Sequence, residues 1–279
     1  MKRSLLAVPL LVLLACKEKP RDSGTGGTDG SNSSGSTDTA AARFASGMGS
    51  LVGAAVDGAG GTVWLYGGGD SLQAFTRAGA PGPSVEAPGE RADDVDIEFT
   101  TDTLTLGTTP VPAGSLLFIN GESGPAEIYA VHPTTGAVIA TLETQFGAGH
   151  VVGGAWHTGR RTFFLVQDNQ PAAPEANRIA EIDPATGRVV SSFLLADRFS
   201  VHYGDLEVHG ATGNLLVVSS SETRLAEFTP AGELVRYVAL PEGISSLSGI
   251  GLDDARGEAW VSSTGGNVWR LSGFARPSP

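Results

Sequence analysis

The chain has 279 residues, with 18 basic and 30 acidic side chains and a formal net charge of −12. A surface this acidic argues against a nucleic-acid partner and suits cations or basic partners. The single cysteine excludes an internal disulfide and a cysteine-rich zinc site.

The first 16 residues have the pattern of an export signal. A basic pair, Lys2 and Arg3, precedes an apolar stretch at residues 4–15. This stretch is too short to span a bilayer as a stable helix, but it suits the hydrophobic region of a signal peptide. It ends in Leu-Leu-Ala-Cys at residues 13–16, and this ending resembles the lipobox of bacterial lipoproteins. The resemblance implies that Cys16 carries the lipid, including palmitate, and becomes the first residue of the mature chain.

Residues 17–40 are predicted to form a tether between the membrane and the folded part. Every residue from 23 to 39 is Ser, Gly, Thr, Asp or Asn, so this segment cannot bury apolar surface and is expected to be a flexible coil. Lys17 follows the cysteine in place of the aspartate that commonly retains such lipoproteins in the inner membrane. By that analogy the outer membrane is expected, where the host has one.

Residues 41–279 are predicted to form one all-β domain built from internal repeats. Segments 127–142, 179–193 and 225–238 share one phrase, in which an alternating strand, a turn with Pro and Gly, and a second alternating strand follow one another. Proline presets φ at the start of the turn and glycine accepts positive φ at its end, so each segment predicts a β-hairpin. Degenerate copies lie at residues 72–79 and 268–273.

Another pair of short strands is predicted before each hairpin. The first strands of these pairs are expected at residues 53–56, 96–99, 153–156, 205–208 and 249–252. The second strands are expected at residues 63–66, 116–119, 162–166, 214–218 and 259–262. Five units of about four strands match the blades of a β-propeller, and small residues in the first strand suit its crowded axis.

The last unit stops after its third strand, and residues 41–48 are the candidate to complete it. The sequence therefore predicts an all-β fold, a β-propeller of five four-stranded blades closed by an N-terminal strand. A ring of six blades and a two-sheet sandwich are the alternatives.

The repeats also carry a family resemblance. Asp-Ile-Glu at residues 96–98, Asp-Leu-Glu at 205–207 and Asp-Pro-Ala-Thr-Gly at 183–187 resemble the SdiA-regulated (YjiK-like) propellers. That group is similar to esterase-like phytases, NHL-repeat proteins and regucalcin-type lactonases, and the resemblance covers about residues 50–274. It implies calcium binding by the matching glutamate, Glu207, and by repetition Glu98.

Four acids align on the predicted innermost strands. Asp96 and Glu98 occupy the same positions as Asp205 and Glu207, where the other three blades have glycine or alanine. Strand side chains alternate between faces, so each pair projects to one side, which could be the central channel. Four clustered carboxylates need a cation, hydrogen-bond donors or raised pKa values, and oxygen ligands favour Ca²⁺. The alternative is that these acids hydrate the channel or pair with arginines.

Two histidine pairs recur in the third and fourth units. His150 and His202 precede a first strand, whereas His157 and His209 follow it. The first pair is therefore expected at the same channel mouth as Asp96 and Asp205, and the second pair in turns on the opposite face. A histidine–carboxylate metal site and ordinary polar turn residues are the two interpretations.

Further polar side chains are expected at this mouth because second strands end beside the starts of first strands. The candidate ligand-binding residues there, besides the two histidines, are Asp93, Asp94, Asn120, Asp168, Asn169 and Glu222. Loops on a rigid scaffold are a usual place for binding.

No motif names a reaction: the chain has no Gly-x-Ser-x-Gly elbow in a strand–helix setting, no His-Glu-x-x-His and no Walker loop. The sequence favours a lipid-anchored binding or scaffold module of the cell envelope, with a structural Ca²⁺ in its channel and an envelope protein or small ligand as partner. The alternative is a Ca²⁺-dependent hydrolase of a phosphoester or lactone. It would use Glu98 or Glu207 as ligand and Asp205 or His202 as base.

Overall fold

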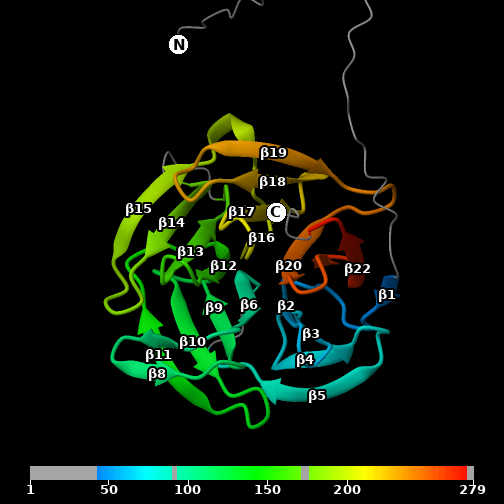
Figure 1. Ribbon diagram of the computed structural model, residues 1–279, viewed down its shortest axis with the longest axis horizontal. Helices are drawn as coiled ribbons and strands as arrows, with labels where there is room; N and C mark the ends of the chain where they lie inside the picture. Colours follow the sequence, from blue (N-terminus) through cyan, green and yellow to red (C-terminus); the bar gives the residue numbers. More distant parts are fainter. Residues whose placement is uncertain (1–42, 90–92, 171–175, 275–279) are drawn as a thin grey trace, which may run out of the picture. The chain divides into compact units, whose positions relative to one another are not determined.

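The structure is a computed structural model that describes residues 43–89, 93–170 and 176–274. Nearly all regular structure in these residues is β-strand, and the strands form five four-stranded sheets. The sheets surround a central axis (Figure 1), which confirms the prediction of a five-bladed β-propeller. The predicted signal peptide and tether lie outside the described residues. Within those residues, no helix is long and apolar enough to cross a membrane.

Each of the first four blades is continuous in sequence, apart from one inserted hairpin in blade 2, and its strands follow one another from the axis to the rim. Blade 1 contains β2 (Gly53–Asp57), β3 (Thr62–Tyr66), β4 (Ser71–Thr76) and β5 (Pro81–Glu86). Blade 2 contains β6 (Val95–Phe99), β9 (Leu116–Asn120), β10 (Glu127–Val131) and β11 (Val138–Glu143). Blade 3 contains β12 (Val151–His157), β13 (Thr162–Gln167), β14 (Arg178–Ile182) and β15 (Val189–Leu194). Blade 4 contains β16 (Gly204–Val208), β17 (Leu215–Ser219), β18 (Arg224–Phe228) and β19 (Leu234–Ala239).

Blade 5 is built from both ends of the propeller. Its strands are β20 (Leu247–Asp253), β21 (Glu258–Ser263), β22 (Asn267–Ser272) and β1 (Arg43–Ala45). β1 pairs antiparallel with β22, and Phe44 lies opposite Val268. The predicted N-terminal closing strand is therefore confirmed, and the six-bladed alternative is wrong. The Phe44 ring also lies 5.6 Å from that of Phe75 in blade 1, so β1 joins the first and last blades.

Glycine on the innermost strands reflects how closely these strands approach each other. A Cβ atom added to Gly53 would lie 2.9 Å from the backbone nitrogen of Ile97, and one added to Gly153 would lie 2.6 Å from the Cα of Asp205. Gly249 meets the backbone of blade 1 in the same way. Because the obstacle is backbone in each case, no larger side chain fits at these three positions.

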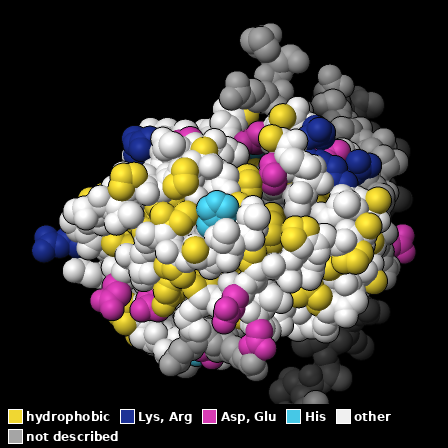
Figure 2. Space-filling view, turned by 90° about the horizontal axis from the view of Figure 1, so that it is seen from below, with side chains coloured by type: hydrophobic (Ala, Val, Ile, Leu, Met, Phe, Trp, Pro, Cys, Tyr) yellow, Lys and Arg dark blue, Asp and Glu magenta, His cyan; other side chains and the backbone are white. Residues whose placement is uncertain are grey.

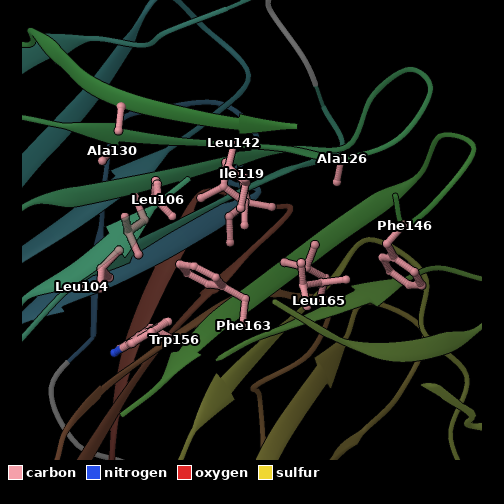
Figure 3. Close-up of a cluster of buried hydrophobic side chains, with 14 of the residues drawn as sticks. Leu104, Leu106, Ile119, Ala126, Ala130, Leu142, Phe146, Trp156, Phe163 and Leu165 are labelled. Atoms are coloured by element: carbon pink, nitrogen blue, oxygen red, sulfur yellow. The ribbon is translucent and has the colours of Figure 1, made fainter. Parts of the chain in front are cut away.

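The apolar core lies between neighbouring blades. One buried cluster brings Ile119 of blade 2 against Phe163 and Leu165 of blade 3 (Figure 3). A hairpin inserted between β6 and β9, formed by β7 (Leu104–Leu106) and β8 (Thr109–Val111), adds its two leucines to this cluster. The sequence did not predict this hairpin.

On the face of the molecule seen in Figure 2, the acidic side chains do not form one patch. The side view in Figure 2 shows acidic side chains scattered among hydrophobic and uncharged ones rather than gathered in one patch. Within the blades, the recurring glutamates of the third strands pair with arginines: Glu181 with Arg160 at 2.8 Å, and Glu227 with Arg236 at 2.6 Å. These arginines are therefore engaged away from the channel.

Candidate functional site at the channel mouth

The four channel acids lie on the two innermost strands where the sequence places them. Asp96 and Glu98 are in β6, and Asp205 and Glu207 are in β16. The side chains of Asp96, Glu98 and Asp205 are buried. Among the described residues, no arginine forms an ion pair with any of the four, so the arginine-pairing alternative is not what the structure shows.

Backbone amides of the next blade hold three of these acids instead. The bonds run from Gly154 N to Asp96 Oδ2 (3.1 Å), from Trp156 N to Glu98 Oε2 (2.9 Å) and from Ile250 N to Asp205 Oδ2 (2.7 Å). The acids thus satisfy N–H groups that face the axis, where no further strand is available. They connect blade 2 to blade 3, and blade 4 to blade 5.

The carboxyl groups of Asp96 and Asp205 lie at the axis, close enough to act on each other's pKa. Asp205 uses both oxygens as acceptors, from Leu206 N at 2.5 Å and Ile250 N at 2.7 Å. Asp96 Oδ1 is buried and accepts no hydrogen bond. Two carboxyl groups can bond to each other only if one is protonated, so we infer that Asp96 carries the proton and donates it to Asp205.

The interaction between the two carboxyl groups shifts their pKa values in opposite directions. Burial raises the pKa of Asp96 well above its usual range, and the negative charge of Asp205 raises it further. Burial raises the pKa of Asp205 to about 8, although the hydrogen bond from Asp96 acts in the opposite direction.

The ligand atoms that converge belong to a different group, at the end of the channel where the innermost strands begin. Asp94, His150 and Asp168 offer ligand atoms that all lie within 4.8 Å of one another. We call these three residues the mouth triad. In the described part of the chain the channel acids form no such group, so a channel calcium site stays a prediction.

Three blades supply the mouth triad and its nearest neighbour. Asp94 lies just before β6, His150 just before β12, Asp168 just after β13, and His202 two residues before β16. His150 Nδ1 lies 2.6 Å from Asp94 Oδ2, and His202 Nδ1 lies 3.6 Å from Asp168 Oδ2. His202 Nδ1 is buried and has no hydrogen-bond partner in the described structure, so it is available as a fourth ligand atom.

The electrostatics of the triad favour a bound cation. Burial raises the pKa of Asp94 to about 6; His150 opposes this shift, while Asp168 and Glu122 add to it. Burial also raises the pKa of Asp168, against a hydrogen bond from Gln170 N and the nearby histidines. Two buried carboxylates this close repel each other, and a divalent ion between them would remove that repulsion.

The backbone beside the triad is held in an unusual conformation. His150 has φ of 59° and Tyr203, next to His202, has φ of 43°. Non-glycine residues rarely adopt this left-handed region, and each such residue costs on the order of 1–3 kcal/mol. A hydrogen bond from Asp168 N to His150 O, 3.0 Å long, fixes the histidine against the end of β13.

Glu122, which no sequence pattern indicated, supports the backbone that leads to the triad. Its Oε2 accepts hydrogen bonds from the backbone nitrogens of Asp93 (2.9 Å) and Asp94 (3.1 Å). The predicted mouth residue Asn120 accepts a hydrogen bond from Glu122 N at 3.1 Å and so helps to position Glu122. The signal that could have found Glu122 is its position just after a second strand.

Asn169 and Glu222 bind the loop beside the mouth. Asn169 donates to Ser200 Oγ at 2.6 Å, and Glu222 accepts from Ser200 N at 3.4 Å. His157 and His209 lie at the other ends of their innermost strands, on the opposite face as predicted. His209 bonds to Thr212 Oγ1 and to the carbonyl of Phe274, both at 2.9 Å, which gives it a structural role.

A cavity of about 340 Å³ opens at the same mouth. Its lining consists of Ser50, Val52, Asp93, Tyr203, Ser220, Ser246 and Thr264. Tyr203 lies close enough to the triad that, besides burial, the charges of Asp94, Asp93 and Asp168 raise its pKa. The mouth therefore combines a group of metal-ligand side chains with a hydroxyl-rich cavity whose lining carries no cation.

Neither a family model nor a curated protein matches the sequence. Among solved structures, the chain is similar to the glutaminyl cyclase of Myxococcus xanthus, with 13% identity, a TM-score of 0.56, and coverage of 84% of this chain and 95% of that chain. It is also similar to XC5397, a gluconolactonase from Xanthomonas campestris, with 17% identity, a TM-score of 0.50, and coverage of 80% and 71%.

A streptogramin B lyase structure gives 15% identity and a TM-score of 0.45; the match covers 80% of this chain but only 64% of the lyase chain. At these identities the similarities concern the fold alone. The comparisons and the five blades together show that the chain is a β-propeller.

Proposed function

We propose that this chain is a lipid-anchored propeller of the cell envelope that binds a divalent metal ion at its channel mouth and, through the ion, a small ligand. The observation that carries the proposal is the convergence of Asp94, His150 and Asp168, with the unpartnered nitrogen of His202 beside them. Buried carboxylates beside an unsatisfied imidazole are the environment that a metal ion completes.

The donor set indicates which metal to expect. Two carboxylates and two imidazoles suit Zn²⁺, Mn²⁺ or Fe²⁺, whereas Ca²⁺ prefers oxygen ligands throughout. The mouth is therefore proposed as the site of a transition metal. The calcium ion predicted from the sequence for Glu98, Glu207, Asp96 and Asp205 is not part of this proposal, because these four acids form no converging ligand group in the described residues.

A metal-dependent hydrolase is the second candidate function. The cavity beside the triad favours this function. Three or four side chains would leave a coordination position of the ion open, and a ligand in the cavity could occupy it. The cavity lining includes Asp93 and no cation, so it suits an uncharged ester such as a lactone better than a phosphoester.

Metal binding should be visible as thermal stabilisation. We expect Zn²⁺ or Mn²⁺ at about 100 times its dissociation constant to stabilise the metal-free propeller by about 2.7 kcal/mol, which raises the Tm by about 5–10 °C. Ca²⁺ and Mg²⁺ should shift the Tm less. The shift should weaken as the pH falls below about 6, because Asp94 then binds a proton that competes with the metal.

His150→Gly should abolish this shift while accepting the left-handed backbone of that position. The matched control is His132→Ala, because His132 lies in a hairpin turn away from the mouth, where its Nδ1 accepts from Thr134 N. If the metal raises the Tm of His150→Gly and His132→Ala by the same amount, the metal binds elsewhere. Turnover of lactones that depends on the metal and is lost in His150→Gly would favour the hydrolase.

The lipid anchor has its own test. In a bacterial host the full chain should incorporate labelled palmitate and sediment with membranes, whereas Cys16→Ser should do neither, because this chain has no other cysteine. Palmitate incorporation into the serine variant would contradict the anchor. Separation of inner and outer membranes would then test the expected outer-membrane location.

A further inference from the structure

The channel has a second cavity at the end opposite the mouth triad, where the innermost strands finish. This lower cavity has a volume of about 360 Å³. Apolar side chains, among them Val56, Phe99 and Leu252, form part of its wall, and the carboxyl groups of Glu98 and Glu207 lie in it. No lysine or arginine lines it, and a third carboxylate, Asp254, completes its acidic side.

Glu207 differs from the other three channel acids. Asp96, Glu98 and Asp205 each accept a backbone N–H from the next blade. The corresponding bond from Glu207 would reach Leu252 in β20, but Glu207 Oε1 instead accepts from Val208 N of its own strand, at 2.8 Å. Glu207 therefore makes no bridge between blades, and a structural role of that kind does not account for it.

Two carboxyl oxygens remain open toward the lower cavity. Glu98 is 8% exposed and bonds through Oε2 only, and Glu207 bonds through Oε1 only. In the described structure neither second oxygen has a hydrogen-bond partner, and neither is sealed from solvent. Both oxygens are acceptors that solvent can reach, so they are open to a hydrogen-bond donor that enters the cavity.

The charges around Glu207 select the kind of donor. Burial raises the pKa of Glu207 well above its usual range, and Glu98, Asp205 and Asp254 raise it further. Burial raises the pKa of Glu98 to about 8, and burial keeps the pKa of His157, the imidazole in the wall, below its ordinary value. A bound cation would offset the negative charge of this lining, in which no lysine or arginine takes part.

We propose that the lower cavity is a binding site for a small organic amine, with its ammonium group on Glu207 and its hydrocarbon chain against Val56, Phe99 and Leu252. The volume is large for a single metal ion, and in the described structure no third ligand atom converges with Glu98 and Glu207. An alkylammonium ion has both the charge and the apolar chain that this wall complements. The site is separate from the mouth triad and does not depend on it.

Calorimetry with 1,4-diaminobutane tests the proposal. The full chain should bind the diamine at neutral pH, seen as a saturable heat of binding. Glu207→Gln should weaken binding by about tenfold or more, because the ammonium loses a charged partner. The matched control, Glu233→Gln, changes an exposed glutamate in a hairpin turn and should bind like the wild type.

Two further arms make the result decisive. His150→Gly should bind the diamine unchanged, whatever happens to metal binding at the mouth, so the two proposals can fail separately. A thermal melt of Glu207→Gln should match or exceed that of the wild type, which excludes loss of fold. Equal diamine affinity in Glu207→Gln and wild type would overturn the amine site, as would binding of Ca²⁺ but not of diamine through Glu207.

Discussion

Asp205→Asn is expected to lower the free energy of unfolding by about 2–4 kcal/mol at neutral pH. Asp205 accepts Leu206 N through one oxygen and Ile250 N through the other. An asparagine at this position must direct its NH₂ group toward one of these two N–H donors. In the variant, one backbone N–H at the axis therefore loses its acceptor and faces the NH₂ group of the asparagine, which is also a donor.

Asp96→Asn is expected to act in the opposite direction. Its amide oxygen can accept from Gly154 N, and its NH₂ group can donate to Asp205 as the carboxyl proton does now. The substitution thus keeps both hydrogen bonds and no longer requires a proton. We expect the free energy of unfolding of Asp96→Asn to be close to that of the wild type at pH 5 and higher than that of the wild type at pH 8.

The pH dependence follows from the raised pKa of Asp96. The folded protein holds this proton at pH values where the unfolded chain, with a pKa of 3.8, has lost it. The folded state then binds more protons, so its stability falls as the pH rises from about 4 toward the folded pKa, by about 1.4 kcal/mol per pH unit for each retained proton. Asp96→Asn should remove this contribution to the slope.

Urea unfolding of both variants and the wild type at pH 5, 6, 7 and 8 checks these expectations. Glu233→Gln, an exposed substitution far from the axis, serves as control and should follow the wild type at every pH. If Asp96→Asn destabilises the protein as much as Asp205→Asn at pH 8, the proton does not reside on Asp96.

Phe44→Ala is expected to lower the free energy of unfolding by about 2–4 kcal/mol, a large effect for a residue in a three-residue strand. The ring lies 5.6 Å from Phe75 in blade 1 and 6.4 Å from Trp260 in blade 5. Removing it leaves a cavity where the first and last blades meet. A chain that starts at residue 49 lacks β1 altogether and should melt lower still.

Val235→Ala is the matched control, because Val235 lies on the outermost strand of blade 4 and is 48% exposed. Thermal melts of Phe44→Ala, Val235→Ala and the chain that starts at residue 49, each compared with a chain that starts at residue 36, should separate ring closure from general strand stability. An unchanged Tm for the chain without β1 would show that the ring does not depend on this strand.

The repeats made the fold predictable because each blade repeats the same local physics. Alternating strands and Pro–Gly turns recur at a fixed spacing, and the predicted innermost strands fall within β2, β6, β12, β16 and β20. The inserted hairpin escaped prediction because Pro110 lies within β8, and proline usually argues against a strand.

The site was less predictable because it depends on loops from different blades. The sequence placed Asp94, Asp168, His150 and His202 at one mouth, but it could not indicate that the first three would converge within 4.8 Å. It put more weight on Asp96 and Asp205, whose carboxyls instead bind backbone amides. Whether an acid bonds to a neighbouring blade depends on distances across the axis, and no local pattern contains those distances.

The odd number of blades limits how acids can alternate around the axis. Blades 2 and 4 carry an aspartate where blades 1, 3 and 5 carry glycine, so acid and glycine alternate. A ring with an even number of blades could alternate throughout, but an odd ring must place two like blades side by side. Here the two neighbours are blades 5 and 1, where the chain also closes on itself. At this seam Arg77 of blade 1 pairs with Asp253 and Glu258 of blade 5, so an arginine links blades 5 and 1, whereas aspartates link blade 2 to blade 3 and blade 4 to blade 5.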